Sequence, residues 1–92
     1  MVVFADRFAN AYFGRGNTYR QQGNLEQAID DYTHAVEINP QYANAFFNRG
    51  ISYAERGNNP RAIADLESYL RLTPDASDAQ QVREHIDRLQ GG

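Results

Sequence analysis

The chain lacks cysteine, lysine and tryptophan altogether, and all nine of its basic residues are arginines. Without cysteine it has neither a disulfide framework nor a thiolate metal site, so the fold must rest on packing alone. The net charge of −3 does not favour a nucleic-acid or anionic-membrane surface. No apolar run approaches the ~18 residues that a transmembrane helix needs. The apolar start, residues 1–4, is too short for a signal peptide and lacks its basic flank. We therefore expect one small domain with a cytoplasmic location.

What the sequence does contain is a repeat with a period of 34 residues. Residues 9–42 align without a gap on residues 43–76, with 13 identities in 34 positions. A fixed period of this size predicts stacked structural units, each of which buries its apolar face against the next. Proteins of this architecture usually bind other molecules rather than catalyse reactions. The six most informative pairs are Gly16/Gly50, Tyr19/Tyr53, Gly23/Gly57, Asn24/Asn58, Ala28/Ala62 and Pro40/Pro74.

Apolar residues recur at helical spacing and never alternate as they would in a strand. Gly23 and Gly57 are typical of the position that ends a helix, and Asn24 is a candidate cap for the helix that follows. Ser77 followed by Gln80 has the form of a capping box. Five helices are predicted, over residues 4 or 6–22, 25–38, 41–56, 59–73 and 77–89 or 90.

Connections of two to four residues force neighbouring helices to run antiparallel. Gly16 and Ala28, repeated 34 residues later, suit a close crossing of the two helices within one repeat. Tyr19 and Tyr53 are expected to fill the remaining space beside these crossings.

A family resemblance follows from these residues. Residues 9–42 resemble a tetratricopeptide repeat and residues 43–76 resemble a second one, although Tyr69 stands where the family and Ala35 have alanine. The resemblance implies an all-α fold, a right-handed α-solenoid of antiparallel helix hairpins with five helices. It divides a single domain, 1–92, into repeat 1 (9–42), repeat 2 (43–76) and a C-terminal capping helix (77–90). The pattern is carried by Ala11, Tyr12, Gly16, Tyr19, Gly23, Ala28, Tyr32, Ala35 and Pro40.

The two ends of the chain depart from the repeat. The fifth predicted helix has one apolar stripe, which predicts a cap over the end of the second repeat. The stripe consists of Ala79, Val82, Ile86 and Leu89. At the other end, Met1, Val2, Val3, Phe4 and Phe8 form an apolar edge without an evident cover. That edge suggests either self-association or a missing upstream repeat.

Few residues have the arrangement of a catalytic or metal site. His34 has Asp30, Asp31 and Glu37 within one helical turn, a spacing that can assemble metal ligands. A solvated acidic helix face explains the same pattern and is favoured. No nucleophile motif or phosphate loop is present in the sequence. We expect no enzymatic activity, no cofactor and no metal.

Arginine and aspartate recur together in both repeats. Arg15 and Arg49 are each followed sixteen residues later by an aspartate, Asp31 and Asp65. Reversal of the chain in each hairpin would bring arginine and aspartate together. The sequence therefore predicts one structural ion pair in each repeat.

The resemblance also implies a binding surface, because in this family the first helices of successive repeats line a concave groove that accepts an extended peptide or a helix. Side-chain amides there hold a peptide backbone from both its donor and its acceptor side. Phenylalanines add apolar contact, although Phe13 and Phe47 have the alternative of being ordinary packing residues. The residues that the resemblance places in the groove are Asn10, Phe13, Asn17, Arg20, Asn44, Phe47, Asn48, Ile51, Asp78, Gln81 and Val82.

One class of ligand is disfavoured by the same comparison. Family members that bind the acidic C-termini of chaperones use two asparagines flanked by basic residues. Asn17 and Asn48 stand at the two asparagine positions, but the basic positions hold Phe13, Asp78 and Val82. A ligand with an apolar anchor is therefore expected instead of an acidic tail.

The predicted function is a non-enzymatic protein–protein interaction module that binds a peptide or helix of a partner, with no nucleic acid and no membrane. Two alternatives stay open. In the first, the chain is a self-assembly domain that forms a homo-oligomer through its apolar N-terminal edge. In the second, it is an accessory segment of a larger enzyme.

Overall fold

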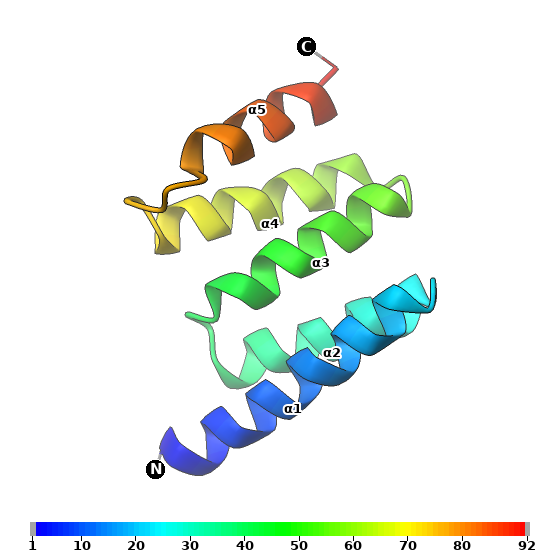
Figure 1. The fold of residues 1–92 in the computed structure, drawn as a ribbon, viewed down its shortest axis with the longest axis vertical. Coiled ribbons are helices and arrows are strands. Elements are labelled where there is room, and N and C mark those ends of the chain that lie inside the picture. Colours follow the sequence, from blue (N-terminus) through cyan, green and yellow to red (C-terminus); the bar gives the residue numbers. More distant parts are fainter. Residues whose placement is uncertain (1, 92) are drawn as a thin grey trace.

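The computed structural model describes the backbone of residues 2–91 and the side chains of residues 7–91. The described residues form five helices and no strand, which confirms the all-α prediction (Figure 1). Among these helices, none combines the length and the apolarity needed to cross a membrane. In chain order the helices are α1 (Val2–Gln21), α2 (Leu25–Ile38), α3 (Ala43–Glu55), α4 (Asn59–Leu72) and α5 (Ala79–Leu89).

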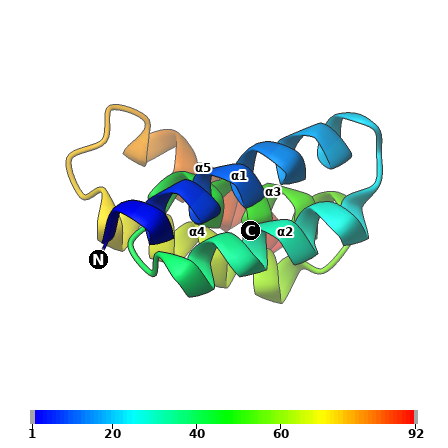
Figure 2. The same ribbon diagram turned by 90° about the horizontal axis from the view of Figure 1, so that it is seen from below.

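The helices stack into an elongated body of 42 × 30 × 18 Å with the two termini at opposite ends of its long axis (Figure 1). Each helix packs against the next one in the chain, and α1 makes only sparse contact with α3. Seen from below, α1, α3 and α5 lie in one layer and α2 and α4 in the other (Figure 2). This arrangement brings side chains of the first, third and fifth helices to one face of the molecule.

Glycine ends the first helix of each repeat in the left-handed conformation. Gly23 has φ +81° and Gly57 has φ +88°, values that side chains with a Cβ rarely adopt. The N–H of Asn24 donates to the carbonyl of Tyr19 at 2.9 Å, and the N–H of Asn58 donates to that of Tyr53 at 2.8 Å. These are the hydrogen bonds of a Schellman motif, so both hairpins reverse by the same mechanism.

Capping at the helix starts differs from the predictions. The predicted cap, Asn24, makes no side-chain bond to α2, whereas Asn58 caps α4, since its side-chain oxygen accepts from the N–H of Arg61 at 3.4 Å. The capping box predicted from Ser77 and Gln80 is wrong. The last helix begins at Ala79, two residues later than predicted, and the residue at its cap is Asp78, whose carboxylate accepts a hydrogen bond from Tyr69 instead.

Two other helix starts also differ. The first helix begins earlier than predicted, at Val2. The third begins at Ala43 and not at residue 41, because Asn39 holds the preceding residues in a turn. The carbonyl of Asn39 accepts from the N–H of Tyr42 at 3.1 Å, and its side-chain oxygen accepts from the N–H of Gln41 at 3.1 Å.

The helices within each repeat cross closely at a glycine, as predicted. A Cβ on Gly16 would lie 3.3 Å from the carbonyl oxygen of Ala28, and one on Gly50 would lie 3.2 Å from that of Ala62. At the first crossing, Tyr32, fully buried on α2, lies against Gly16. At the second crossing, Tyr53 is buried in one cluster with Ala62, as expected.

The buried apolar residues form a series of clusters between consecutive helices. Ala35, Val36 and Ala45 join α2 to α3, and Ile29 with Tyr53 and Ala62 continues this contact into α4. The third cluster joins α4 to α5 and contains Leu66, Tyr69, Val82 and Ile86.

The apolar N-terminal edge is described only in part. The side chains of Met1, Val2, Val3 and Phe4 lie outside the described residues. Phe8 is 60% exposed, the one large apolar side chain of the described region that stands out in solvent.

Candidate functional site

The predicted binding residues lie in stripes on consecutive helices of one layer. On α1, Asn10, Phe13, Asn17 and Arg20 are three or four residues apart, which places them on one face of the helix. On α3, Asn44, Phe47, Asn48 and Ile51 follow the spacing i, i+3, i+4, i+7, which also lies on one face of a helix. Asp78 precedes α5, and Gln81 and Val82 lie in its first turn. We refer to this set as the α1–α3–α5 face.

Two asparagines from different repeats meet on this face. The amide nitrogen of Asn48 donates to the amide oxygen of Asn17 at 2.8 Å, and the hydroxyl of Tyr32 donates to the same oxygen. These bonds fix both amide groups. Within the described part of the chain, no side chain is hydrogen-bonded to the amide nitrogen of Asn17 or to the amide oxygen of Asn48. The pair therefore keeps one donor group and one acceptor for a ligand.

Phe13 lies beside the asparagine pair in an aromatic cluster. Its ring centroid is 5.0 Å from that of Tyr42 and 5.9 Å from that of Tyr32. The hydroxyl of Tyr42 donates to the exposed Asn10 side chain at 2.7 Å, which ties α1 to the start of α3. Phe13 is half-buried, so one part of its ring packs and the other is available to a ligand.

A hollow of about 220 Å³ lies between α3 and α5. It contains four of the predicted residues, and Val82 at its base is only 4% exposed and belongs to the core. Phe47 is half-buried there, with its ring centroid 5.1 Å from that of Tyr69. The residues lining the hollow are Phe47, Asp78, Gln81, Val82, His85 and Arg88.

Asp78 is held in place at the edge of this hollow. The hydroxyl of Tyr69 donates to its carboxylate oxygens at 2.8 and 3.1 Å. Burial, together with this hydrogen bond, raises the pKa of Tyr69. The tyrosine that replaces the alanine of the first repeat thus orients Asp78, so the packing at this position differs between the repeats.

Burial also raises the pKa values of Tyr32 and Tyr42 above the ordinary value of 10. Because the folded-state pKa values of these three tyrosines exceed the unfolded ones, their contribution to stability is fully present below about pH 10. It is lost as the pH rises through the folded-state values. We expect an absorbance titration at 295 nm to show at least three tyrosines ionising late in the folded protein. The same titration in urea should give ordinary values, and identical curves would contradict the prediction.

The remaining predicted residues are dispersed. Arg20 pairs with Glu55, with Nε 3.4 Å from Oε1, so its charge is already partnered. Ile51 is half-buried and packs against the cluster between α4 and α5. Asn44 and Gln81 are exposed.

The sequence prediction omitted two residues of the hollow, His85 and Arg88. They follow Gln81 by four and seven residues on α5, and helical spacing alone would have placed them on the same face. With Asp78 and Arg88 both present, the hollow is lined by one carboxylate and one guanidinium.

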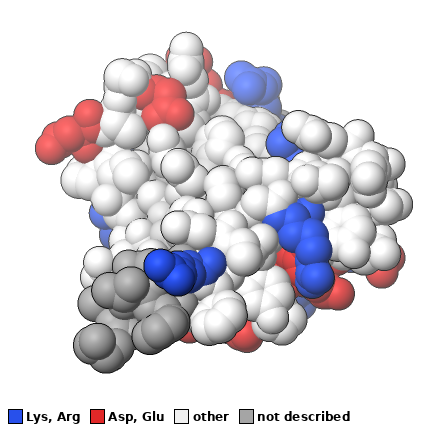
Figure 3. Space-filling model, turned by 60° about the horizontal axis from the view of Figure 1, so that its bottom comes forward, with Lys and Arg blue, Asp and Glu red and all other residues white. Residues whose placement is uncertain are grey.

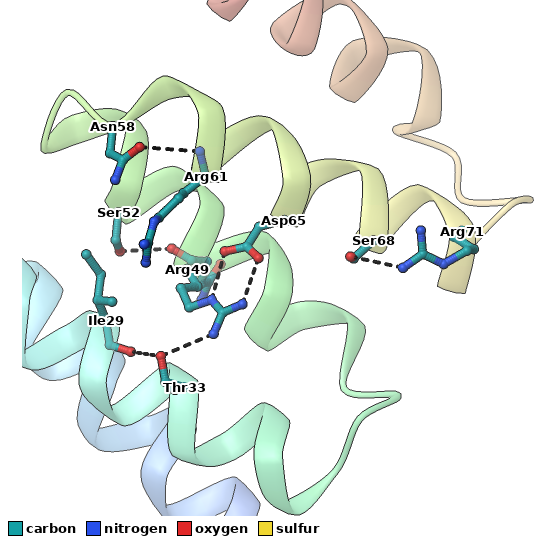
Figure 4. Close-up of polar contacts among 10 residues, drawn as sticks. Ile29, Thr33, Arg49, Ser52, Asn58, Arg61, Asp65, Ser68 and Arg71 are labelled. Atoms are coloured by element: carbon teal, nitrogen blue, oxygen red, sulfur yellow. Dashed lines mark hydrogen bonds and ion pairs between the residues drawn. The ribbon is translucent and has the colours of Figure 1, made fainter.

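Both predicted ion pairs are confirmed. Arg15 binds Asp31 through two hydrogen bonds of 2.8 Å, and Arg49 binds Asp65 through two of the same length (Figure 4). The carboxylates are buried, and each arginine lies between two aromatic rings of its own helix. The hydrogen bond to Asp65 raises the pKa of Arg49.

Arg49 has a further partner on the preceding repeat. Its Nη1 donates to the hydroxyl of Thr33 on α2 at 3.1 Å (Figure 4). Thr33, Arg49 and Asp65 all line a hollow of about 450 Å³ on the side of α2 and α4, away from the α1–α3–α5 face. Because Arg49 and Asp65 pair with one another, we assign these two residues a structural role.

His34 is engaged with its own surroundings. Its ring stacks on Tyr12 with 4.8 Å between centroids, and Nδ1 lies 2.8 Å from the carbonyl oxygen of Asp30. Within the described region, no three His, Cys, Asp or Glu side chains are grouped so that they could hold a metal ion.

Two family models match the chain. One, described as "TPR repeat", matches residues 16–55, and another, described as "Tetratricopeptide repeat", matches residues 36–87. Comparison with curated protein sequences gives no match.

Several solved structures resemble the chain. The crystal structure of MamA protein is 26% identical with a TM-score of 0.82, over 90% of this chain and 45% of that one. The Yersinia enterocolitica type III secretion translocator chaperone SycD is 14% identical with a TM-score of 0.82, over 89% and 59%. The first TPR of Spaghetti (RPAP3), bound to the HSP90 peptide SRMEEVD, is 21% identical with a TM-score of 0.57, over 95% and 96%. The chain thus spans about half the length of the first two proteins.

Proposed function

Because the chain belongs to the tetratricopeptide repeat family, we propose that it is a non-enzymatic interaction module that binds a peptide segment of a partner protein along its α1–α3–α5 face. The family assignment supports protein–protein interaction as the general role. The binding face, the extended form of the ligand and the absence of catalysis belong to the proposal.

The observation that carries the proposal is the asparagine pair. Asn17 and Asn48 are fixed by one another and by Tyr32, so their free donor and acceptor groups are already oriented. A peptide backbone offers a carbonyl acceptor and an N–H donor, which these two amides match. Because the amides lose little freedom on binding, more of the interaction energy is available for affinity.

The side-chain preference of the ligand follows from the surroundings of this pair. Half-buried phenylalanines lie on both sides of the asparagine pair. Phe13 is on α1 in the first repeat, and Phe47 is on α3 in the hollow beside α5. The hollow carries no excess positive charge, since Asp78 and Arg88 oppose one another. We therefore expect a ligand with an apolar side chain seated on Phe47, and an affinity near the micromolar range, about −8 kcal/mol.

Phe47 provides the test. A pull-down from lysate of the source cells identifies partners of the parent protein, and a titration then measures the affinity of one purified partner. Phe47→Ala removes the aromatic side chain that lines the hollow, and we expect the dissociation constant for the partner to rise at least tenfold.

Phe47 also packs on Tyr69, so the variant must be compared at a temperature where circular dichroism shows it to be fully folded. Glu67→Ala, an exposed change on α4, serves as the matched control and should bind as the parent does. If the folded Phe47→Ala protein binds the partner with the parent's dissociation constant, the assigned face is wrong.

A further inference from the structure

A second surface lies on α1, at the end of the molecule where the chain begins, and its side chains are exposed or half-buried. We call it the end face and define it by Phe8, Ala11, Tyr12, Arg15 and Tyr19. The first four line a hollow of about 260 Å³, and the Arg15 side chain is 60% exposed. In Figure 3, where this end of the molecule comes forward, most of the described surface is uncharged, with arginines on it and acidic residues beside one of them and toward the edges of the view.

The same five positions of the second repeat are covered. Their counterparts 34 residues later are Tyr42, Ala45, Phe46, Arg49 and Tyr53. Ala45 is fully buried and the Arg49 side chain is only 17% exposed, whereas Ala11 is exposed. The difference arises because α2 of the preceding repeat packs on the second set. The first set contacts α2 of its own repeat, since Tyr12 stacks on His34 and Arg15 binds Asp31, but the described residues include no helix of a preceding repeat to cover it.

The covering helix presents a short, regular stripe. Ile29 packs with Tyr53, and Val36 packs in the cluster that contains Ala45. Between them, the hydroxyl of Thr33 accepts a hydrogen bond from Nη1 of Arg49. The interface on the second repeat therefore recognises a helix with an apolar residue, an uncharged acceptor four positions later and a second apolar residue three positions after that.

The end face is already arranged to receive such a stripe. Arg15 is held by Asp31 through two hydrogen bonds and lies over the rings of Tyr12 and Tyr19, just as Arg49 is held in its own repeat. The described residues supply no acceptor to Nη1 of Arg15, the atom whose counterpart binds Thr33. Since Asp31 balances the charge, a neutral acceptor suffices.

We propose that the end face binds an amphipathic helix of a partner protein, whose contact stripe has the chemistry of Ile29, Thr33 and Val36. This extends the established interface between α2 and α3 by one step toward the N-terminus. The site is separate from the α1–α3–α5 face and takes a helix, not an extended peptide.

A second copy of the chain offers a poorer fit. The outward side of α5 carries Gln80, Arg83, Glu84 and Asp87, all exposed, while its apolar residues are buried against α4. Two end faces meeting one another would bring Arg15 against Arg15. Neither arrangement supplies the stripe that α2 supplies to the second repeat.

The chain itself contains the probe for this proposal. A peptide of residues 24–39, acetylated and amidated, carries the required stripe, and isotope-labelled full-length protein reports where it binds. Because so short a helix must order as it binds, the titration is run to millimolar peptide by two-dimensional NMR. We expect saturable shifts centred on Phe8, Tyr12 and Arg15.

Matched variants isolate the contacts. In the peptide, Val36→Asp should weaken binding at least tenfold by placing a charge in the apolar stripe, and Thr33→Val should weaken it by removing the acceptor for Arg15. In the protein, Phe8→Asp should weaken binding at least tenfold without unfolding the domain, since this side chain is 60% exposed. Glu67→Ala should leave binding unchanged.

Three results would overturn the proposal. The first is the absence of NMR shifts at millimolar peptide, and the second is a set of shifts confined to Asn17, Phe47 and Asn48. The third comes from light scattering of the protein alone: a concentration-dependent dimer that Phe8→Asp abolishes. The last result would identify a second copy as the occupant.

Discussion

Arg49→Met is expected to lower the free energy of unfolding by about 3 kcal/mol, because it leaves the carboxylate of Asp65 buried without its partner. This is the lower end of the usual range for breaking a buried pair, since the Arg49 side chain is 17% exposed and water reaches its edge. A domain of this size has a total stability of roughly 5–13 kcal/mol. The loss is therefore a large share of the whole, and urea denaturation measures it directly.

A double-mutant cycle with Asp65→Asn separates the ion pair from the loss of packing. The double variant should recover part of the stability that Arg49→Met loses, because the buried carboxylate is then neutral. Arg15→Met is the matched control in the first repeat. We expect a smaller loss there, since Arg15 is 60% exposed and its removal opens Asp31 to water. A coupling energy of zero between Arg49 and Asp65 would contradict the structural role.

Gly16→Ala is expected to destabilise the domain by about 1–3 kcal/mol, although alanine is by far the better helix former. The new Cβ would lie 2.8 Å from Cε1 and 3.0 Å from Cδ1 of Tyr32. Tyr32 is fully buried and bonded to Asn17, so its ring has little room to withdraw. The carbonyl oxygen of Ala28, at 3.3 Å from the Cβ, limits movement of the backbone as well. Overpacking therefore exceeds the gain in helix propensity.

Gly14 provides the control on the same helix. A Cβ there meets nothing within 4 Å, so Gly14→Ala should stabilise the protein by about 0.5–1 kcal/mol through propensity alone. Thermal and urea denaturation of the two variants should therefore shift in opposite directions. Equal shifts of the same sign would show that the close crossing at Gly16 carries no energetic weight.

The features that could be predicted from the sequence are those set by local chemistry or by the period. Gly23 and Gly57 end helices because the reversal needs a left-handed residue, and that need is visible in a single position. The Arg49–Asp65 pair follows from a spacing that a hairpin brings together. In each case one element, or two adjacent ones, determine the result.

The features that could not be predicted depend on competition between distant groups. Ser77 and Gln80 have the form of a cap, but the position of the last helix is set by the bond from Tyr69 to Asp78. The side chain that lies against Gly16 is Tyr32, which comes from the facing helix, and at Gly50 the corresponding side chain is Leu66, so the repeat does not determine this contact. On the α1–α3–α5 face, the bond between the two asparagines joins different repeats, and only the stacking of the repeats determines it.

The contacts of Arg49 also have a consequence for how the array comes apart. In a linear array, total stability is the sum of a term for each unit and a term for each junction between neighbours. This guanidinium contributes to both kinds of term, since it closes its own hairpin through Asp65 and joins the preceding one through Thr33. Opening the junction thus loosens the hairpin, and opening the hairpin releases the junction. The two repeats are for this reason expected to melt as one cooperative unit.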